Sequence, residues 1–289
     1  MAVTLIPPKA PNLPIGPVDY SQQYVDQLLN ALRLYFNQID NFNFGIAQNN
    51  GGAYLSFPYA AFHYDNQRVL GSTMTTTSTT AITVDSTDGY VAPGAILIGT
   101  EVITYTSIPN STTFDGTITR GAYGTTKAAH AIGAAITSIQ ATTAATRTAI
   151  YFNSIDYSNG VTIIPSPPST EMTTDYAGIY NIQFSLQFAN ADTAADNVTV
   201  WFNINGVDIP STSGIIAVPG SHGGFSGQTI VGWNNLTPLN LGDIFRLYWS
   251  SDSGNTVLAT YPIGTAPVHP SSPCAAISFT FVSAIPVVV

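Results

Sequence analysis

The side chains of this chain that could support acid–base catalysis are few and scattered. Its four histidines lie far apart in a sequence of 289 residues, and none has the spacing of a zinc site: His63, His130, His222 and His269. Glycan hydrolysis needs two carboxylates that face each other about 5–10 Å apart. Glu101, Glu171 and the aspartates give no ground for choosing such a pair. We therefore expect no enzyme and no cofactor, and a polysaccharide depolymerase is the less favoured alternative.

Three aspartates carry oxygen atoms of the kind that calcium binds. Asp192, Asp196 and Asp208 lie in polar segments, but they lack the spacing of an EF-hand loop. Solvated loop carboxylates are the favoured interpretation, so no metal site is predicted. The sequence also has no nucleophile elbow, no P-loop and no dinucleotide-binding fingerprint.

The composition limits the possible partners. Only 8% of the residues are charged, the net charge is -9, and the seven Lys and Arg residues form no cluster. Nucleic-acid binding is therefore not expected. Charged residues are depleted in the cores of protein interfaces, so the composition suits a surface partly covered by other copies of the chain. We expect neither a membrane-spanning helix nor a secretory signal. Cys274, the single cysteine, is expected to be buried.

Alternation of apolar and polar residues predicts β-strands in the C-terminal half. Ile182, Phe184, Leu186 and Phe188 alternate with polar residues, which places one set on each face of a strand. The same pattern recurs at residues 198–205, 245–249 and 277–281, each next to turn residues such as Asn205-Gly206. Strands of this kind predict a mainly β protein, an antiparallel sandwich or jelly roll.

The N-terminal part has a different pattern. Five prolines within residues 1–18 predict an extended arm. Residues 19–42 are expected to form an amphipathic helix that starts at an N-cap, Asp19 or Ser21. Its apolar residues follow heptad spacing, with further apolar residues such as Phe36 beside them: Val25, Leu28, Leu32, Tyr35, Ile39 and Phe42. The helix either packs on its own β-domain or associates with copies or a larger assembly, and the second alternative is favoured. Residues 43–53 are predicted to be a linker.

Residues 72–139 differ in texture from the rest of the chain. They contain short apolar runs separated by glycine and proline turns, and Thr-rich segments flank them. The simplest interpretation is a small β-module inserted into a loop of a jelly roll made of residues 54–71 and 140–289.

Five segments resemble the C1q/TNF-like jelly rolls of bacteriophage structural proteins. They are FHYDNQ at 62–67, IDYSNGV at 155–161, AGIYNIQFS at 177–185, VWFNING at 200–206 and LGD at 241–243. Residues 94–135 resemble a β-module that recurs in phage tail and fibre proteins, through IGTEVITYT at 98–106, TFDG at 113–116, TRGAYGTT at 119–126, His130 and Gly133. The helix segment LRLYFNQID at 32–40 is similar to leader segments of marine and cyanobacterial phage virion proteins.

The resemblance implies a homotrimeric tail fibre or knob protein, located on the virion and made in the bacterial host cytoplasm. A capsid decoration or cement protein is the alternative. The trimer seam would use aromatic residues, with these candidates: Tyr180, Phe184, Tyr248 and Phe279. The helix would anchor the protein to other virion proteins through Val25, Leu28, Leu32, Tyr35, Phe36 and Ile39.

Host attachment through a surface glycan or protein would use loops 190–196, 219–227 and 250–255. Their small and polar residues suit weak contacts, which threefold repetition would strengthen. The candidate receptor residues in these loops are Asp192, Asp196, His222, Phe225 and Asp252.

Overall fold

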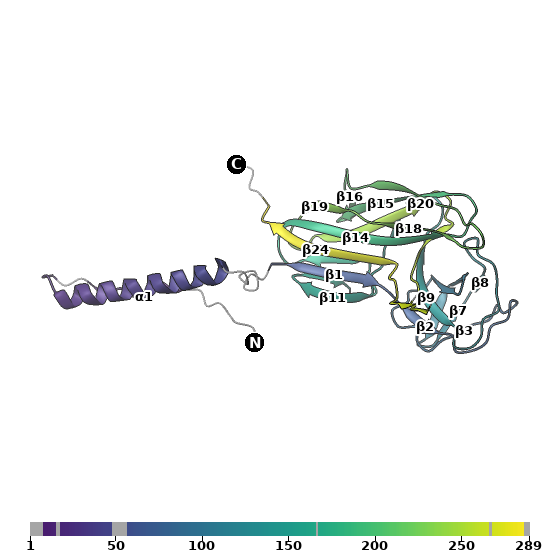
Figure 1. Ribbon diagram of the computed structural model, residues 1–289, viewed down its shortest axis with the longest axis horizontal. Coiled ribbons are helices and arrows are strands. Elements are labelled where there is room, and N and C mark those ends of the chain that lie inside the picture. The colour runs from purple at the N-terminus through teal and green to yellow at the C-terminus, as the bar shows by residue number, and fades with distance from the viewer. Residues whose placement is uncertain (1–7, 16–17, 48–56, 166, 266–267, 286–289) are drawn as a thin grey trace. The chain divides into compact units, whose positions relative to one another are not determined.

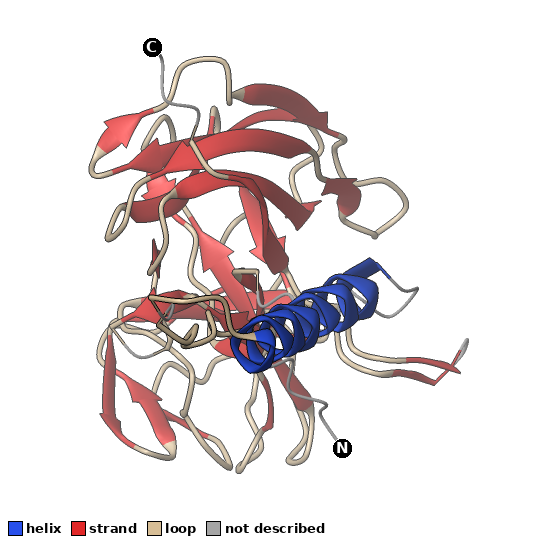
Figure 2. Cartoon of the chain, turned by 90° about the vertical axis from the view of Figure 1, so that its left-hand side faces the viewer, coloured by secondary structure: helices blue, strands red, loops and turns tan. Residues whose placement is uncertain are grey.

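The structure is a computed structural model that describes residues 8–15, 18–47, 57–165, 167–265 and 268–285. The chain divides into two units, residues 1–57 and residues 58–289. Within the described residues the protein is mainly β and contains one helix (Figures 1 and 2). The predicted fold class, an antiparallel β-sandwich with an inserted small β-module and a helix after a proline-rich arm, is confirmed.

The first unit contains helix α1 (Gln22–Ala47). Ser21 caps it, since its Oγ accepts a hydrogen bond from the Tyr24 amide at 3.3 Å. The helix continues past Phe42, so the predicted linker does not begin at residue 43. Phe42 and Ile46 are four residues apart and continue the apolar spacing, while Gly45 costs only about 1 kcal/mol of helix propensity. Residues 48–53 of the predicted linker lie outside the described residues.

In residues 8–15 of the arm, the solvent exposure of the side chains repeats every three residues. Pro8, Pro11 and Pro14 are half-buried, and the residues between them are exposed. Three residues per turn is the period of a polyproline II helix, which brings every third residue to one side. The exposure pattern of the described part of the arm therefore matches a polyproline II helix with its prolines on the less exposed side.

The second unit is built from two main antiparallel sheets. The first has the order β11 (Ser154–Asn159), β1 (Tyr59–Tyr64), β24 (Ala275–Ser283), β14 (Gly178–Asn190), β21 (Thr256–Ala259), β9 (Ala135–Ala141), β4 (Gly94–Ile98), β5 (Glu101–Tyr105) and β8 (Thr119–Arg120). β18 (Gly227–Val231) and β19 (Asn234–Leu239) also pair with β14, and β2 (Gln67–Val69) pairs with β9.

The second sheet has the order β12 (Val161–Ile164), β13 (Glu171–Thr174), β20 (Ile244–Ser251), β15 (Asp196–Ile204) and β16 (Val207–Asp208). β10 (Thr148–Ala149) pairs with β20, and β17 (Gly214–Val218) pairs with β15. Two small sheets complete the unit: β3 (Ile82–Thr83), β7 (Thr113–Asp115) and β6 (Ser107–Asn110), and the hairpin of β22 (Gly264–Thr265) and β23 (Val268–His269).

The core of the sandwich lies between the inner faces of the two main sheets. β14 buries alternate residues from Tyr180 to Phe188, as its period of two predicted. From the other sheet, β15 and β20 contribute Phe202 and Trp249 to the same cluster. Cys274 is fully buried there, as expected, and its burial raises the thiol pKa to about 12. The hairpin turn after β15 is also confirmed, since Asn205 and Gly206 both have positive φ angles, 53° and 83°.

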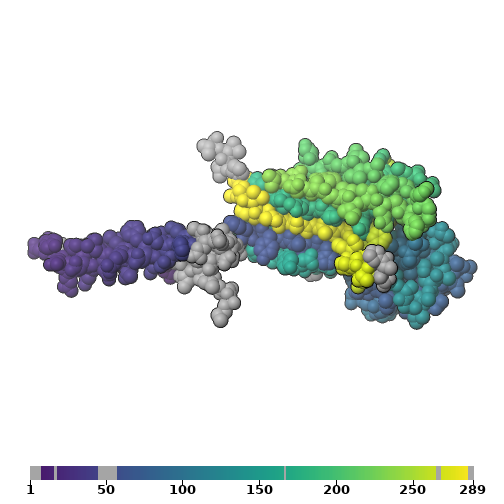
Figure 3. All heavy atoms as spheres, in the orientation of Figure 1, coloured from purple at the N-terminus to yellow at the C-terminus, as the bar shows by residue number. Residues whose placement is uncertain are grey.

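The inserted module has a hydrophobic cluster of its own. Twelve buried residues form it, all between positions 70 and 136: Leu70, Met74, Ile82, Val84, Tyr90, Ile96, Ile98, Ile103, Tyr105, Phe114, Ile118 and Ile136. In the space-filling view the module, coloured blue to teal, packs against one end of the sandwich (Figure 3).

Strand β9 joins the module to the sandwich. Ile139 pairs with Ala95 of β4 on one side and with Ala259 of β21 on the other. The first main sheet therefore runs without interruption from the sandwich into the module, a continuity that the sequence did not predict.

The buried face of β14 makes a direct prediction for stability. Leu186→Ala removes a side chain that is 0% exposed and should lower the free energy of unfolding by about 2–5 kcal/mol. Ile215→Ala, at a residue that is 74% exposed, is the matched control and should change it by less than about 0.5 kcal/mol. Urea unfolding followed by tryptophan fluorescence measures both. Equal effects of the two variants would contradict the assignment of this face to the core.

Candidate binding site between the sandwich and the inserted module

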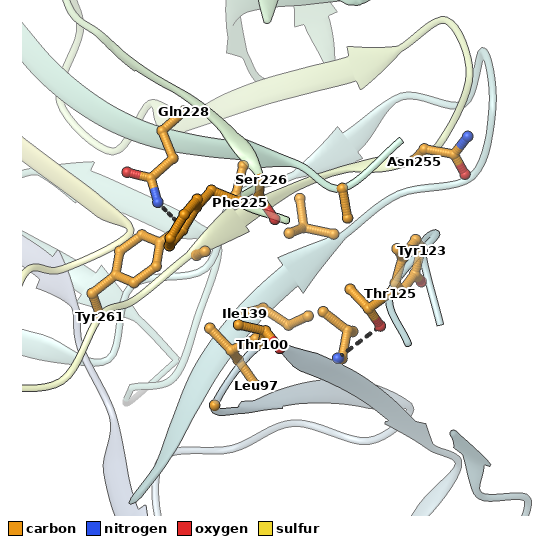
Figure 4. A pocket seen from close by; sticks show the side chains of 16 residues that line it. Leu97, Thr100, Tyr123, Thr125, Ile139, Phe225, Ser226, Gln228, Asn255 and Tyr261 are labelled. Atoms are coloured by element: carbon orange, nitrogen blue, oxygen red, sulfur yellow. Dashed lines mark hydrogen bonds between the residues drawn. The ribbon is translucent and has the colours of Figure 1, made fainter. Parts of the chain in front are cut away.

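A pocket of about 200 Å³ lies where the module meets the end of the sandwich (Figure 4). Its base is formed by five residues of a small hydrophobic cluster to which both parts contribute: Val102, Ile139, Ala189, Val257 and Ala259. Leu97 and Tyr261 pack against this cluster and also line the pocket. The base is therefore apolar and is held by paired strands rather than by loops.

Phe225 stands at the mouth of the pocket on the sandwich side. It lines the pocket although it is 77% exposed. His222 and Phe225 hold the tip of their loop closed by exchanging two backbone hydrogen bonds, of 2.9 and 3.1 Å. Gly223 and Gly224 lie between them with φ angles of 61° and 83°, which glycine adopts at no steric cost. The turn thus holds a large aromatic ring in solvent beside an apolar hollow.

Tyr123 belongs to the module and lines the side of the pocket opposite Phe225, as Figure 4 shows. Its φ angle is 53°, in the left-handed region that bulky residues rarely adopt. Its neighbours Gly121 and Gly124 also have positive φ angles. Backbone strain of this kind persists only where surrounding contacts enforce it, and it concentrates at functional sites.

Hydroxyl and amide groups supply the polar part of the lining. Thr100, Thr125, Ser226, Gln228 and Asn255 line the pocket. The Gln228 Nε2 donates to the Tyr261 hydroxyl at 2.9 Å, and the Asn255 Nδ2 donates to Asp192 at 2.8 Å. None of the described residues that line the pocket is charged.

A buried ionic cluster fixes the loop that carries Tyr123. The Glu101 carboxylate accepts two hydrogen bonds from Arg120, of 2.7 and 2.8 Å, and one of 3.0 Å from each of the backbone amides of Gly121 and Ala128. His130 Nε2 lies 2.8 Å from the same carboxylate. Glu101 is 0% exposed. One carboxylate therefore holds both ends of the segment 121–128.

The same contacts determine how Glu101 titrates. Burial opposes its ionisation, but the hydrogen bonds from Arg120, the Ala128 amide and His130 outweigh burial and lower its pKa from 4.5 to about 2. Glu101 is thus a structural carboxylate that stays ionised far below neutral pH.

The three loops predicted to contact a receptor come together beside this pocket. The Ser221 amide donates to the Asp192 carbonyl at 2.6 Å, and Asn255 donates to the Asp192 carboxylate. His222 and Asp252 are exposed, and Asp192 is half-buried. Asp252 accepts a hydrogen bond from Asn197 at 3.2 Å.

Asp196 corrects the prediction for these loops. It is only 4% exposed and begins β15 rather than ending a loop. Its carboxylate accepts hydrogen bonds from the Ser251 hydroxyl at 2.5 Å and from the Ser253 amide at 3.0 Å, which fixes the 251–254 turn. Asp196 therefore supports the loops from beneath and does not face a ligand.

The candidate seam residues also need correction. Tyr180, Phe184 and Phe279 are at most 5% exposed and belong to the core of the protomer. Their side chains therefore cannot form the contact surface between subunits. Tyr248 differs, because it points outward from β20 and stacks on Trp201 with ring centroids 5.9 Å apart.

The six residues predicted to anchor the helix divide into two groups. Five lie on the half-buried stripe of α1: Val25, Leu28, Leu32, Tyr35 and Ile39. Phe36 is 57% exposed and lies off that stripe. The helix thus offers an exposed aromatic residue in addition to the predicted heptad positions.

Two further aspartates pair separately with Arg147 and His63. Asp208 pairs with Arg147 at 3.3 Å, and His63 pairs with Asp156 at 3.0 Å. Within the described residues, no group of three or more His, Cys, Asp or Glu side chains is placed to hold a metal ion. Asp192, Asp196 and Asp208, considered from the sequence as oxygen donors for calcium, each have a different hydrogen-bond partner.

Sequence reasoning missed Tyr123, Tyr261 and Gln228 as site residues. The segment Gly121-Ala122-Tyr123-Gly124 carried the only available signal, an aromatic residue between glycines that permit an unusual backbone. Gln228 and Tyr261 are 33 residues apart and meet only through the fold.

Comparison of the chain with protein-family models and with curated proteins found no match. Among the described residues, no helix combines the length and hydropathy needed to cross a membrane.

The Glu101 cluster predicts acid sensitivity. Because the pKa of Glu101 is about 2 in the folded protein and 4.5 ordinarily, its ionised form stabilises the fold fully above pH 4.5, and this contribution is lost as the pH falls towards 2. Glu101→Gln should lower the free energy of unfolding at neutral pH by about 3–5 kcal/mol, because Arg120 then stays buried without its partner.

The variant should also lose part of the pH dependence between 4.5 and 2. Urea titrations at several pH values measure this, with Asp252→Asn as the exposed control. A Glu101→Gln protein whose stability changes with pH as steeply as the wild type would contradict the assignment.

Proposed function

We propose that the protein is a non-enzymatic structural and attachment protein of a bacteriophage virion, a homotrimeric tail fibre or knob protein. Its N-terminal unit would bind other virion proteins, and the sandwich with its module would contact the host surface. The resemblance of the sandwich segments and of residues 94–135 to phage proteins supports this proposal. So does the low charge of the chain, which suits extensive contact between copies.

The observation that carries the binding role is the pocket between the sandwich and the module. Its aromatic rings, hydroxyls and amides are groups that hold a ligand by stacking and hydrogen bonding. The predicted receptor loops meet at its edge. A pocket of this composition favours binding over hydrolysis, which would need a pair of facing carboxylates.

The outer face of the first main sheet is the surface we assign to contacts between subunits. It exposes apolar side chains on four strands: Tyr59 on β1, Tyr157 on β11, Leu236 on β19 and Val282 on β24. Figure 3 shows part of this face, with β24 in yellow beside β1. Clusters of exposed apolar residues of this kind commonly mark protein–protein interfaces.

A trimer makes a simple prediction about solution mass. Light scattering at two concentrations should give three times the 30.5 kDa of one chain, with no change on dilution. Tyr157→Lys should shift the mass towards one chain, because a charge at an apolar interface must be desolvated. Ile215→Lys, at a residue that is 74% exposed on β17 of the other sheet, is the matched comparison and should leave the trimer intact. A wild-type protein with the mass of one chain would contradict the proposed trimer.

The anchoring role predicts what truncation does. A chain that begins at Pro58 keeps the whole second unit and should remain folded and trimeric. It should, however, be absent from virions, because α1 and the arm are removed. Quantitative immunoblotting of purified particles, alongside full-length protein, measures incorporation. Incorporation at the full-length level would refute the anchoring role.

A capsid decoration protein is the second candidate for the same assembly. Labelling the C-terminal unit and locating it by electron microscopy separates the two, since a tail position supports the fibre and a shell position supports decoration.

A further inference from the structure

We propose that the pocket between the sandwich and the module binds one neutral sugar unit that carries a methyl group, as an N-acetylated or 6-deoxy sugar does. This inference rests on the proposed attachment function and names the ligand class of its site. Four properties of the pocket support it: its charge, its size, its aromatic residues and its polar groups.

Charge excludes the acidic and basic ligand classes. None of the sixteen described lining residues is Asp, Glu, Lys, Arg or His. A phosphate or carboxylate ligand would ordinarily meet Arg or Lys, and an ammonium ligand would meet a carboxylate. Asp192 lies nearby, but its carboxylate accepts a hydrogen bond from Asn255, and it is not among the lining residues. The ligand is therefore neutral.

The size of the pocket and its apolar base indicate a single unit with an apolar substituent. The volume of about 200 Å³ lies below the roughly 300–1,000 Å³ of pockets that hold drug-sized ligands. The base consists of alanine, valine, leucine and isoleucine side chains, including Ala189, Val257 and Ile139. A fully hydroxylated ring would lose hydrogen bonds to water against this base, whereas a methyl group would gain by burial.

Two aromatic residues on opposite sides of the mouth can contact the body of a sugar ring. Phe225 comes from the sandwich and Tyr123 from the module (Figure 4). Both are held by unusual backbone geometry, the glycine turn before Phe225 and the positive φ of Tyr123. Exposure of Phe225 leaves a large apolar ring in water, an arrangement that is relieved when a ligand covers it.

The polar groups beside the aromatic rings suit hydroxyl recognition. The Tyr261 hydroxyl accepts a hydrogen bond from Gln228 and keeps its own proton to donate. Burial raises the pKa of Tyr261, so this hydroxyl stays neutral at physiological pH. Thr100 and Ser226 add hydroxyls that both donate and accept. Groups with both capacities match the vicinal hydroxyls of a sugar.

The test uses full-length protein and three free sugars in saturation-transfer NMR at millimolar concentration. L-rhamnose and N-acetylglucosamine should bind, with the strongest transfer at their methyl protons, and glucose should bind at least fivefold more weakly. Phe225→Ala should weaken binding of the preferred sugar by about tenfold, the loss expected for a central aromatic contact. Ile230→Ala, at a 70% exposed residue on β18 that does not line the pocket, should bind like the wild type.

Four results would overturn the proposal. Absence of transfer to all three sugars would remove the ligand class, as would capture of a host surface protein by a chain that binds no sugar. Equal binding of glucose would remove the role of the methyl group. Unchanged binding by Phe225→Ala would place the site elsewhere. Incorporation into virions is measured separately, so failure of the sugar assay leaves the virion proposal standing, and absence from virions leaves the sugar site standing.

Discussion

The structure of the second unit depends on the register of β9. This strand pairs with β2 and β21 along one edge and with β4 along the other, so it carries hydrogen bonds of both the module and the sandwich. In an antiparallel sheet, a shift of one residue turns every side chain to the opposite face. Such a shift would remove Ile139 from the cluster between the two parts, and the base of the pocket with it. The pairing of one strand therefore decides whether the candidate site exists.

Glu101 plays the corresponding part inside the module. Burying an ion pair costs desolvation free energy that its Coulomb attraction often only offsets, so a buried pair is weak support for stability alone. What the cluster does provide is position. Glu101 holds the Gly121 and Ala128 amides, and Arg120 also donates to the carbonyls of Thr75 and Ser78. These contacts fix two irregular segments of the module, residues 75–78 and residues 121–128. The second segment carries Tyr123. Because the buried charges add little net stability, we infer that their main role is to hold the loop of Tyr123 in place.

The sequence could predict those features that depend on residues close together in the chain, and it could not predict contacts between distant segments. Alternation in β14, β15 and β20 is local, so their buried faces and the turn at Asn205-Gly206 were predicted correctly. N-capping is also a local interaction, so the sequence could name Ser21 as one of two N-cap candidates. Burial of Tyr180, Phe184 and Phe279 shows the limit, because period two separates the two faces of a strand without saying which contact covers each face. Asp196 shows it again, since a carboxylate in a polar segment looks the same whether it faces water or a buried turn.

The candidate site was beyond local reasoning because its parts are far apart in the sequence. Phe225 and Tyr123 are brought to one pocket only by β9 and by the loop contacts around Asp192. A pocket that holds a single small unit gains limited free energy from each contact, because binding must also offset the lost freedom of the ligand. In the proposed trimer the same pocket would occur three times, and simultaneous engagement would raise the overall affinity without any new contact. A rigid base favours this mode of binding, since repeated weak sites act together only when their geometry allows simultaneous engagement. The continuity of the sheet through β9 would hold the pocket in one position within each subunit.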